Sequence, residues 1–357
     1  MVRLMVGVLA AMVWEAARGA VLLAQPPAPV SIANEKPVTY KVRQVVKLDG
    51  LKIGAKSVRM WVSIPDDERN QDLLDLHVVS APGKWSIVND HENRARFLRM
   101  DVANPLASSL EVVVEFIVVR KPVHVVVDPK KVAALSPALQ KAFAEHLNRN
   151  APHMKVTPRI QIMADEVCGD ETNAAKEVAL IIAHVMKVAD HYSYSKDAQM
   201  PKCGIGDVEA CLQQGGGCCT DLNSLFIALA RARGIPTRLA MGYRLQEKNV
   251  GKLVDPGYRC WVEYFLTGYG WISADIVEAD TPNGLGPARW ITGLTARRIW
   301  LNSGREFKLA EDLKAGRVNH MSIAYAEIDG VEARLLPEGI LQPQITRQVM
   351  FTELDAK

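Results

Sequence analysis

The feature that most limits the possible folds is a helical segment that begins at a cysteine and ends at a glycine. Glycines precede Cys218 and Cys219, and Gly234 followed by Pro236 closes the segment. A glycine just past the last turn, with a proline beyond it, is a common end of a helix. The apolar residues between these ends recur at the helical period and predict one buried face: Leu222, Leu225, Phe226 and Leu229. We therefore expect a helix that runs from Cys219 to about Arg233.

The position of Cys219 at the start of this helix points to nucleophilic chemistry. The N-terminus of a helix carries about half a positive charge, which favours a thiolate over a thiol. Gly217 and Cys218 belong to the glycine-rich turn before the helix, and the negative charge of Asp221 suits its positive end. An enzyme that uses a thiolate also needs a base, which is usually a histidine.

The segment expected to supply this base contains no histidine. Three strand-like runs follow the helix, at residues 237–243, 259–265 and 271–276, and a glycine-containing turn joins the last two as a hairpin. A nucleophile helix packed on an antiparallel sheet that carries base and orienting acid is the plan of many cysteine enzymes. The middle run begins Tyr258-Arg259-Cys260-Trp261-Val262-Glu263, so an arginine stands where the base is expected.

Together these motifs resemble the transglutaminase-like family of papain-related cysteine enzymes. Cys219-Thr220-Asp221 resembles the nucleophile motif, and Trp261, the Gly270-Trp271 pair and Asp275 resemble the second half of the family pattern. The resemblance implies an α+β fold, with a papain/transglutaminase-like core of a nucleophile helix on an antiparallel sheet, preceded by a β-sandwich domain. It places Cys219 at the nucleophile position, Asp275 at the orienting acid, and Arg259 where the family usually has its histidine.

The arginine can be interpreted in two ways. A guanidinium stays protonated above pH 12 and cannot act as a general base, although the charge of Arg259 could still lower the pKa of Cys219. Asp275 can also pair with Arg259 as a structural ion pair that replaces the histidine–aspartate pair. Of the histidines elsewhere in the chain, His191 is the nearest candidate to reach the site, and a partly exposed structural position is its simpler interpretation.

Further residues near these motifs are candidates for lining the site. Cys218 is either a turn residue or a disulfide partner, and Cys260 is expected to be a buried core thiol. Trp261 and Trp271 are expected in the core or in a groove wall, and Glu263 alternates onto the strand face of Trp261. The candidates for lining the site are Gly217, Cys218, Asp221, Trp261, Glu263 and Trp271. No metal or organic cofactor is implied, because the cysteines lack the paired spacing of a zinc site.

The rest of the chain predicts an exported protein with more than one domain. A positive start, an apolar run and small residues at the N-terminus indicate a secretory signal peptide, so we expect a periplasmic or extracellular location. Short alternating strands before residue 125 indicate a β-sandwich. The expected division is a signal peptide at 1–24, a linker at 25–37, the β-sandwich at 38–125, the transglutaminase-like domain at 126–285 and a β-rich C-terminal extension packed on the core at 286–357.

Three functional hypotheses follow. In the first, the transglutaminase-like domain is catalytically impaired because Arg259 replaces histidine, and it is retained to bind protein, peptide or a cell-envelope polymer. In the second, it is an active thiol enzyme that cleaves or transfers amide or acyl groups through a thioester at Cys219, as a protease, deamidase or crosslinking enzyme. In the third, Cys218 and Cys219 act as a redox pair, although adjacent cysteines lack thioredoxin-like spacing. The net charge of +3 is too small to argue for nucleic acid, and no membrane span is expected after signal cleavage.

Overall fold

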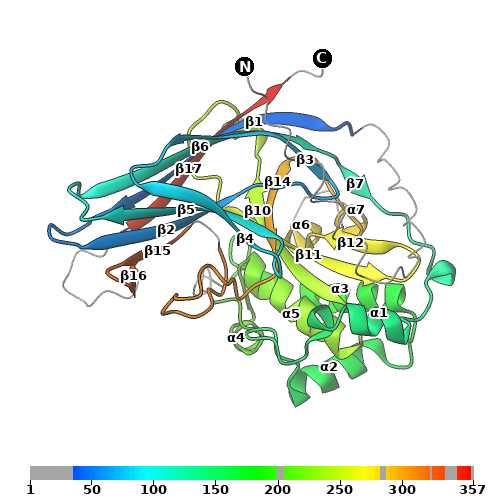
Figure 1. The fold of residues 1–357 in the computed structure, drawn as a ribbon. Coiled ribbons are helices and arrows are strands. Elements are labelled where there is room, and N and C mark those ends of the chain that lie inside the picture. The colour runs from blue at the N-terminus through cyan, green and yellow to red at the C-terminus, as the bar shows by residue number, and fades with distance from the viewer. Residues whose placement is uncertain are drawn as a thin grey trace.

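The protein was analysed as a computed structural model that describes residues 35–197, 199, 205–281, 287–321, 324–333 and 344–354. Over these residues the chain forms a two-sheet β-sandwich and, beside it, a further antiparallel sheet covered by helices (Figure 1). The predicted α+β class is therefore confirmed. The expected signal peptide and all but the last residues of the expected linker lie outside the described residues. Among the described residues, no helix is both long enough and apolar enough to cross a membrane.

Two sheets form the sandwich, and each contains strands from early and late parts of the chain. The first has the order β17-β1-β6-β3. Its strands are β1 (Val38–Asp49), β3 (Gln71–Ser80), β6 (Ser109–Arg120) and β17 (Gln344–Leu354). The second has the order β16-β15-β2-β5-β4. Its strands are β2 (Ser57–Ile64), β4 (Lys84–Asp90), β5 (Ala95–Ala103), β15 (Ala324–Ile328) and β16 (Val331–Glu332).

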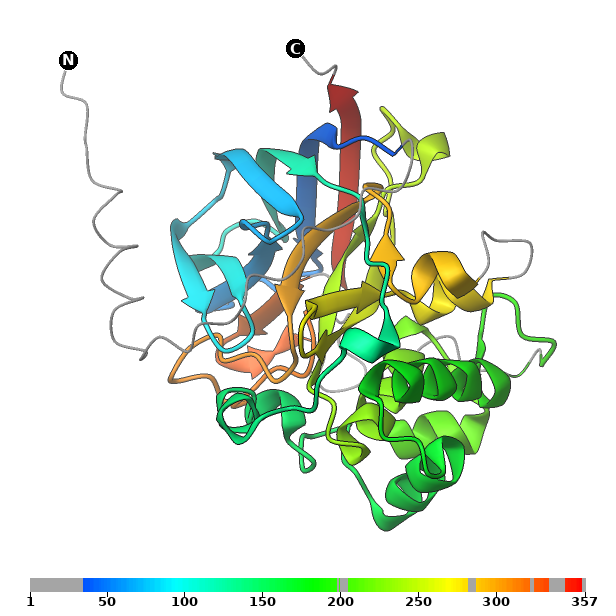
Figure 2. The same cartoon turned by 90° about the vertical axis from the view of Figure 1, so that its right-hand side faces the viewer.

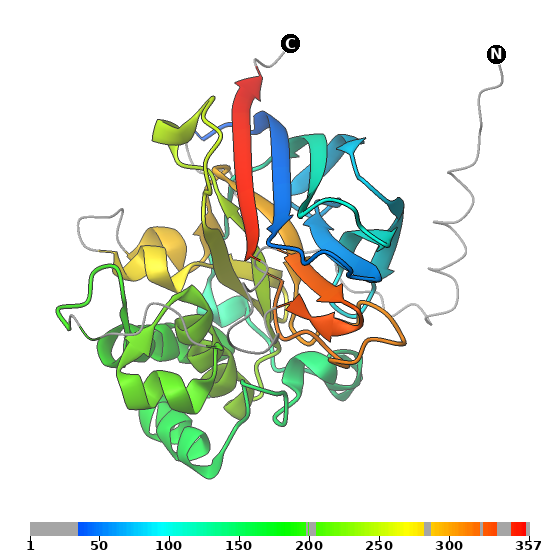
Figure 3. The ribbon, with the colours of Figure 1, turned by 90° about the vertical axis from the view of Figure 1, so that its left-hand side faces the viewer.

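The core of the sandwich follows from the alternation of side chains along its strands. In β1 the side chains of Tyr40, Val42 and Val46 are fully buried, whereas Lys41 between them is exposed. Successive side chains of a strand point to opposite faces of the sheet, so the apolar set faces the other sheet. Phe351 on β17 packs edge-on against Tyr40, with ring centroids 5.9 Å apart. The late strand β17 therefore completes the core that β1 begins, and Figure 3 shows the two strands side by side.

The second half of the molecule is built on a four-stranded sheet with a central helix. The sheet has the order β12-β11-β10-β14. Its strands are β10 (Thr237–Arg244), β11 (Tyr258–Leu266), β12 (Gly270–Ala274) and β14 (Arg298–Ser303). Helix α5 (Cys219–Ala232) packs on β10 and β11, and α2 (Pro158–Cys168) and α3 (Ala174–Val188) cover its other side (Figure 2). Every residue of α5 from Cys219 to Arg231 is buried.

The ends of α5 are those that the sequence predicts. Gly234 adopts a φ of 72°, and the N–H of Ile235 donates a hydrogen bond to the carbonyl of Ala230 at 3.0 Å. A left-handed glycine with a bond from the residue after it is the Schellman type of helix end. The helix therefore begins at Cys219 and ends just before Gly234, which fixes the cysteine at its N-terminus.

Strand β14 joins the two halves of the molecule. It is the edge strand of the sheet under α5, and its Ile299 and Leu301 also belong to the core of the sandwich. The side chain of Gln71, on β3, accepts from the N–H of Trp300 at 2.9 Å and donates to its carbonyl at 2.9 Å. These two hydrogen bonds imitate, through the side chain of Gln71, the backbone pairing of a neighbouring strand, and they connect β14 to the sandwich.

The remaining elements are short. Two pairs of two-residue strands stand apart from the large sheets: β7 (Val123–His124) with β13 (Gly293–Leu294), and β8 (Asp190–His191) with β9 (Gly216–Gly217). The other helices are η1 (Pro129–Lys131), α1 (Pro137–Ala142), η2 (Glu145–Leu147), α4 (Val208–Gln214), η3 (Glu247–Asn249), α6 (Ile276–Asp280) and α7 (Pro287–Trp290).

Candidate active site

The loop that leads into α5 is held by a two-strand parallel pairing. Strand β9 lies beside β8, with Asp190 opposite Gly216 and His191 opposite Gly217. The N–H of Tyr192 donates to the carbonyl of Gly217 at 2.8 Å. At Gly216 the φ is 144°, and a Cβ there would lie 2.0 Å from the carbonyl oxygen of Asp190. Only glycine fits this contact, so the glycine run is needed to bring β8 and His191 against the start of the helix.

We expect Gly216→Ala to lower the free energy of unfolding by ~1–3 kcal/mol, because the new methyl group must push the β8 backbone away. Gly215→Ala is the matched control: that glycine also has a positive φ, of 70°, but a Cβ on it would meet no atom within 4 Å. Urea unfolding of both variants would separate the clash from the backbone strain. Equal losses would show that the close approach of β8 and β9 is unimportant for stability.

Asp221 stabilises the same loop from within the helix. Its Oδ2 accepts from the N–H of Cys218 at 2.9 Å, and its Oδ1 accepts from the N–H of Gly206 at 3.1 Å. A Cβ on Gly217 would lie 2.5 Å from Oδ2, so this glycine leaves room for the carboxylate. Asp221 therefore fixes the turn around the cysteine, in addition to complementing the positive helix end.

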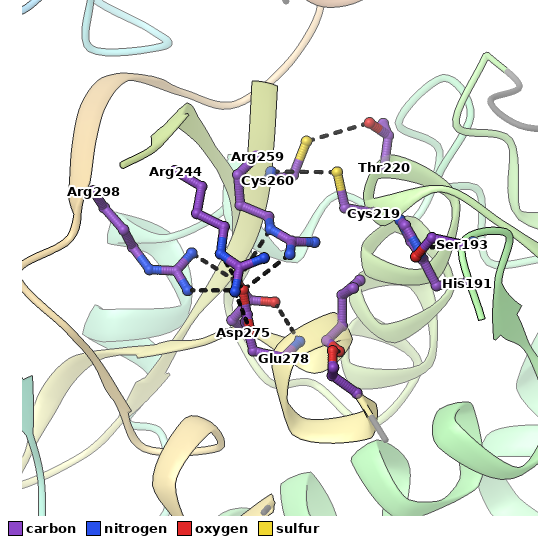
Figure 4. A network of polar contacts seen from close by, with 12 residues as sticks. His191, Ser193, Cys219, Thr220, Arg244, Arg259, Cys260, Asp275, Glu278 and Arg298 are labelled. Carbon is purple, nitrogen blue, oxygen red and sulfur yellow. Dashed lines mark hydrogen bonds and ion pairs between the residues drawn. The ribbon is translucent and has the colours of Figure 1, made fainter. Parts of the chain in front are cut away.

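Cys219 lies at the first position of α5 and is almost completely buried, with 4% of its surface exposed. The N–H of Cys260, on β11, donates to its Sγ at 3.4 Å (Figure 4). A hydrogen bond from Cys218 favours the thiolate, but the contact with Cys260 and burial outweigh it, and the pKa of the Cys219 thiol is raised well above its ordinary value. The nearby charge of Arg259 lowers this pKa only in part. In this closed arrangement Cys219 is a thiol at neutral pH.

The neighbouring polar groups form a chain beside Cys219. The Sγ of Cys260 lies 3.2 Å from the Oγ1 of Thr220, which lies 3.2 Å from the hydroxyl of Tyr258. That hydroxyl is also 3.2 Å from the Sγ of Cys218. Cys260 is fully buried, as expected from the sequence, and Cys218 is almost completely buried. The chain ties β11 to the first turn of α5.

Arg259 is part of a buried cluster of charges on the other side of Cys219. Its Nη2 donates to the Oε1 of Glu278 at 2.9 Å, and its Nε lies 3.8 Å from the Oδ2 of Asp275. The Nη1 of Arg298 donates to the same Oδ2 at 2.6 Å, and the Nε of Arg244 lies 2.9 Å from Glu278. Figure 4 shows the three arginines around the two carboxylates. The ion pair between Arg259 and Asp275 is thus present, but Asp275 bonds more closely to Arg298.

These contacts fix the protonation states of the cluster. Burial disfavours the charge of Arg259, but Asp275, Cys219 and Glu278 outweigh it and hold the pKa of the guanidinium above its ordinary value. Burial would likewise raise the pKa of Asp275, yet Arg298 and Arg259 hold it below its ordinary value. Arg259 is therefore a permanent cation and Asp275 an anion at neutral pH.

His191 is brought close to this group by the pairing of β8 with β9. Burial lowers its pKa to about 4, and the charge of Arg259 acts in the same direction, against Asp275 and Asp221. Its Nδ1 accepts from the N–H of Ser193 at 3.3 Å. The same Nδ1 lies 2.8 Å from the Oγ of Ser193, and the lowered pKa makes the ring neutral at pH 7. The expectation of a partly exposed residue does not describe this position, because only 7% of His191 is exposed.

The two tryptophans have different surroundings. Trp261 is buried under the guanidinium of Arg298, whose Cζ is 5.6 Å from the ring centroid, so it borders the charge cluster. Trp271 pairs with Phe265, which is five residues along β11 from Cys260. That separation is about 17 Å along a strand.

Glu263 and Trp271 both contact the side chain of Arg238. The Nε of Arg238 donates to the Oε2 of Glu263 at 2.6 Å, and the Cζ of Arg238 is 4.1 Å from the Trp271 ring centroid. The structure thus brings Gly217, Cys218, Asp221 and Trp261 to the cysteine or its charge cluster, and leaves Glu263 and Trp271 in a separate contact.

Sequence reasoning did not find Glu278, Arg244 or Arg298. Glu278 had a recognisable signal, because it follows Asp275 by three residues in the pattern of a helix N-terminus, and Asp275 accepts from its N–H at 3.0 Å. Nothing in the sequence near Arg244 or Arg298 indicates that they approach Asp275. These contacts arise only because β14 pairs with β10.

Comparisons with known proteins agree with this architecture. Residues 162–276 match the model of the transglutaminase-like superfamily. A protein of Haemophilus influenzae, described only as uncharacterised, is 31% identical over 209 residues, which are 50% of this chain and 55% of the relative. The match thus spans about half the length of that relative.

A solved structure with a similar fold is also known, and a second solved structure matches only weakly. A candidate cysteine protease from Cytophaga hutchinsonii superimposes with a TM-score of 0.59 at 16% identity, over 90% of this chain and 92% of that chain. At this identity the likeness shows the fold alone. The periplasmic domain of TgpA from Pseudomonas aeruginosa covers 68% of this chain and 90% of its own at 16% identity, with a TM-score of 0.30, too low to compare the two folds.

Proposed function

From the premise that residues 162–276 form a transglutaminase-like domain, we propose that this protein is a catalytically impaired member of the group, retained to bind a protein, peptide or cell-envelope polymer outside the cytoplasm. The observation that carries the proposal is the state of Arg259. It stands at the base position, and its hydrogen bond to Glu278 and its ion pair with Asp275 hold it there as a buried cation.

A permanent cation at this position removes two steps of thiol catalysis. A guanidinium cannot accept the proton of Cys219 and cannot later donate it to a leaving amine. Arg259 could still stabilise a thiolate by its charge, but the pKa of Cys219 is raised despite that charge. The nucleophile therefore stays protonated, and Arg259 returns no proton to the leaving group. Both defects favour binding over turnover.

The second candidate is an active thiol enzyme that uses His191 in place of the missing base. The specific observation in its favour is that His191 is neutral and buried, and that the charges of Arg259 and Asp275 are close enough to shift its pKa. In such an enzyme the Sγ of Cys219 attacks an amide carbonyl, the amine leaves with a proton, and water or another amine then releases the acyl group from the thioester. A protease, deamidase or crosslinking enzyme would share these steps.

The two candidates predict different amide chemistry. We expect the full chain to show no hydrolysis of a peptide amide and no incorporation of a primary amine into a glutamine peptide above the level of Cys219→Ala. The assay is release of amine or ammonia, followed across a panel of peptides at neutral pH. Turnover that Cys219→Ala abolishes would contradict the proposal. Loss of that turnover in His191→Ala, with unchanged alkylation of Cys219, would then support the second candidate.

A further inference from the structure

The two most exposed large apolar side chains among the described residues lie together at one end of the sandwich. Ile53 and Leu106 are fully exposed, whereas the next in order, Val126, is 62% exposed. Ile53 stands in the turn between β1 and β2, and Leu106 in the turn between β5 and β6. Both side chains line one hollow of about 200 Å³. Figure 1 shows these turns at the left-hand end of the sandwich, away from helix α5.

The turn between β1 and β2 is fixed by its backbone and by a buried anchor. The N–H of Ala55 donates to the carbonyl of Lys52 at 3.3 Å, and Gly54 has a φ of 95°, which is the pattern of a type II turn. Leu51, just before the turn, belongs to the sandwich core, and its N–H donates to a carbonyl of the other turn at 2.9 Å. A turn of this type needs the glycine but no aliphatic side chain before it, so the local structure does not account for Ile53.

The turn between β5 and β6 is held against the first turn. The N–H of Asn104 donates to the carbonyl of Lys56 at 2.7 Å. Asn104 has a φ of 46°, a conformation that asparagine adopts more readily than most residues. Pro105 after it is buried, and Leu106 is then fully exposed. Hydrogen bonds between the two turns therefore hold Ile53 and Leu106 on one surface.

The charge beside this apolar pair is positive. Residues 50–57 and 103–108, which make up the two turns, contain two lysines and no acidic residue. Lys52 and Lys56 are both exposed, and neither has an ion pair among the described residues. The acids at the base of the turns already have partners. Asp49 pairs with Lys47 at 2.8 Å, and Asp329 accepts from two backbone N–H groups where β2 begins, at 2.8 Å each.

The size and charge of this surface favour a lipid bilayer as the partner. A stable protein interface takes about 20 residues on each side, whereas ten residues line the hollow between the turns. A bilayer needs no such area, because each apolar side chain that enters it contributes separately. Anionic headgroups complement the lysines, and the hydrocarbon behind them complements the aliphatic side chains.

We propose that this end of the sandwich binds the surface of a bilayer that contains anionic lipids, with Ile53 and Leu106 at the acyl-chain boundary and Lys52 and Lys56 among the headgroups. Removing a large aliphatic side chain from water changes an equilibrium constant by about tenfold or more, and a lysine near an anionic surface changes it by about fivefold. The product for two of each is about 10³–10⁴, which is a reversible contact comparable with one acyl chain. The contact does not involve Cys219, so it is independent of the proposed function.

The first test is sedimentation of the full chain with vesicles of phosphatidylcholine and phosphatidylglycerol. We expect the double variant Ile53→Ser with Leu106→Ser to lower the partition coefficient by about a hundredfold, tenfold for each side chain. Leu74→Ser is the matched control, because Leu74 is exposed on β3 and lies outside the two turns. It should change the partition coefficient by less than about twofold. All three positions are on the surface, so the variants should fold.

The contribution of charge is measured separately. Vesicles of phosphatidylcholine alone should bind the chain about 25-fold more weakly, because both lysines lose their attraction. Lys52→Gln should weaken binding to the anionic vesicles by about fivefold, and this effect should shrink as salt is raised. Lys141→Gln is the control, because Lys141 is an exposed lysine on α1. Equal weakening by the two variants would reduce the attraction to overall charge and overturn the proposal.

A local measurement separates this contact from any other contact of the chain with the vesicles. In Ile53→Trp the added fluorescence should shift to shorter wavelength and be quenched by lipids brominated on their acyl chains, and in Leu74→Trp it should not. Equal quenching in both variants, or none in Ile53→Trp, would contradict the proposal. Self-association that the double variant abolishes, with unchanged vesicle binding, would assign the surface to a second copy and also overturn it. Cys219→Ala should bind vesicles like the wild type, so this result and the amide assay are independent.

Discussion

Replacing Asp275 by alanine is expected to lower the free energy of unfolding by about 3–5 kcal/mol, the usual cost of removing one partner from a buried ion pair. Asp275 is fully buried, and its Oδ2 accepts from the Nη1 of Arg298, which is also almost fully buried. The substitution would leave Arg298 and Arg259 with only Glu278 as a counter-ion. It would also remove the oxygen that caps α6.

The measurement is urea unfolding of the wild type and three variants. Asp275→Asn keeps a cap oxygen but removes the charge. If the charge is the cause, the free energy of unfolding should fall in Asp275→Asn by most of the amount by which it falls in Asp275→Ala. Glu92→Ala is the control, because Glu92 and Arg317 form a pair that is about half exposed, and its loss should cost less than ~1 kcal/mol. A loss in Asp275→Ala no larger than in Glu92→Ala would refute the structural role of the cluster.

The pH dependence of this effect has a definite sign. The folded pKa of Asp275 lies below its unfolded value, so its contribution is fully present above about pH 4, the ordinary pKa of an aspartate. It is lost as the pH falls below that value and through the folded pKa. The difference in free energy of unfolding between the wild type and Asp275→Ala should therefore stay constant from neutral pH down to about pH 4 and decrease only below it.

The second large effect is expected at the cysteine. Arg259→His should raise the rate of Cys219 alkylation by iodoacetamide at pH 7 by about tenfold or more, the change that one unit of pKa produces. A histidine beside Asp275 can accept the thiol proton and then stabilise the thiolate as an imidazolium, which arginine cannot do. In the wild type the pKa of Cys219 is raised, so its alkylation should be slow at pH 7 and should still increase with pH above 9.

Alkylation must be followed on the peptide that contains Cys219, because the chain has six cysteines. Arg259→Met is the matched control: it removes the charge without supplying a base and should leave Cys219 as slow as in the wild type or slower. The contrary outcome is rapid alkylation of wild-type Cys219 well below pH 8 that slows in Arg259→Met. The arginine would then be an activator of the thiolate, and the search for amide substrates would be justified.

Local signals in the sequence were sufficient for the elements that surround Cys219. The helix period, the glycine at position 234 and the turn near residue 268 predicted α5 and the β11–β12 hairpin, and the structure contains both. These features depend on residues close together in sequence. Family resemblance then identified the transglutaminase-like core, which the family model covering residues 162–276 confirms.

The contacts at the site that the sequence does not predict depend on pairing between strands that lie far apart in the chain. Arg298 reaches Asp275 only because β14 joins the sheet beside β10, and a bulge at Met241 and Gly242 shifts the register there. His191 approaches the start of α5 only because a two-residue strand pairs in parallel with Gly216 and Gly217. A two-residue strand has too few side chains to show a period. The raised pKa of Cys219 likewise depends on other segments, because the contact with Cys260 on β11 and burial outweigh the hydrogen bond from Cys218.

The pairing of β1 with β17 has a consequence for how the molecule forms. These strands match residue for residue from Thr39 with Leu354 to Asp49 with Gln344, across most of the chain. The segment between them contains the whole cysteine-bearing core, whose own contacts are closer in sequence. Because pairings across long chain separations close late, the core can fold while the sandwich still has an open edge at β1. The edge of the sandwich at β1 is then paired only after β17 has been synthesised.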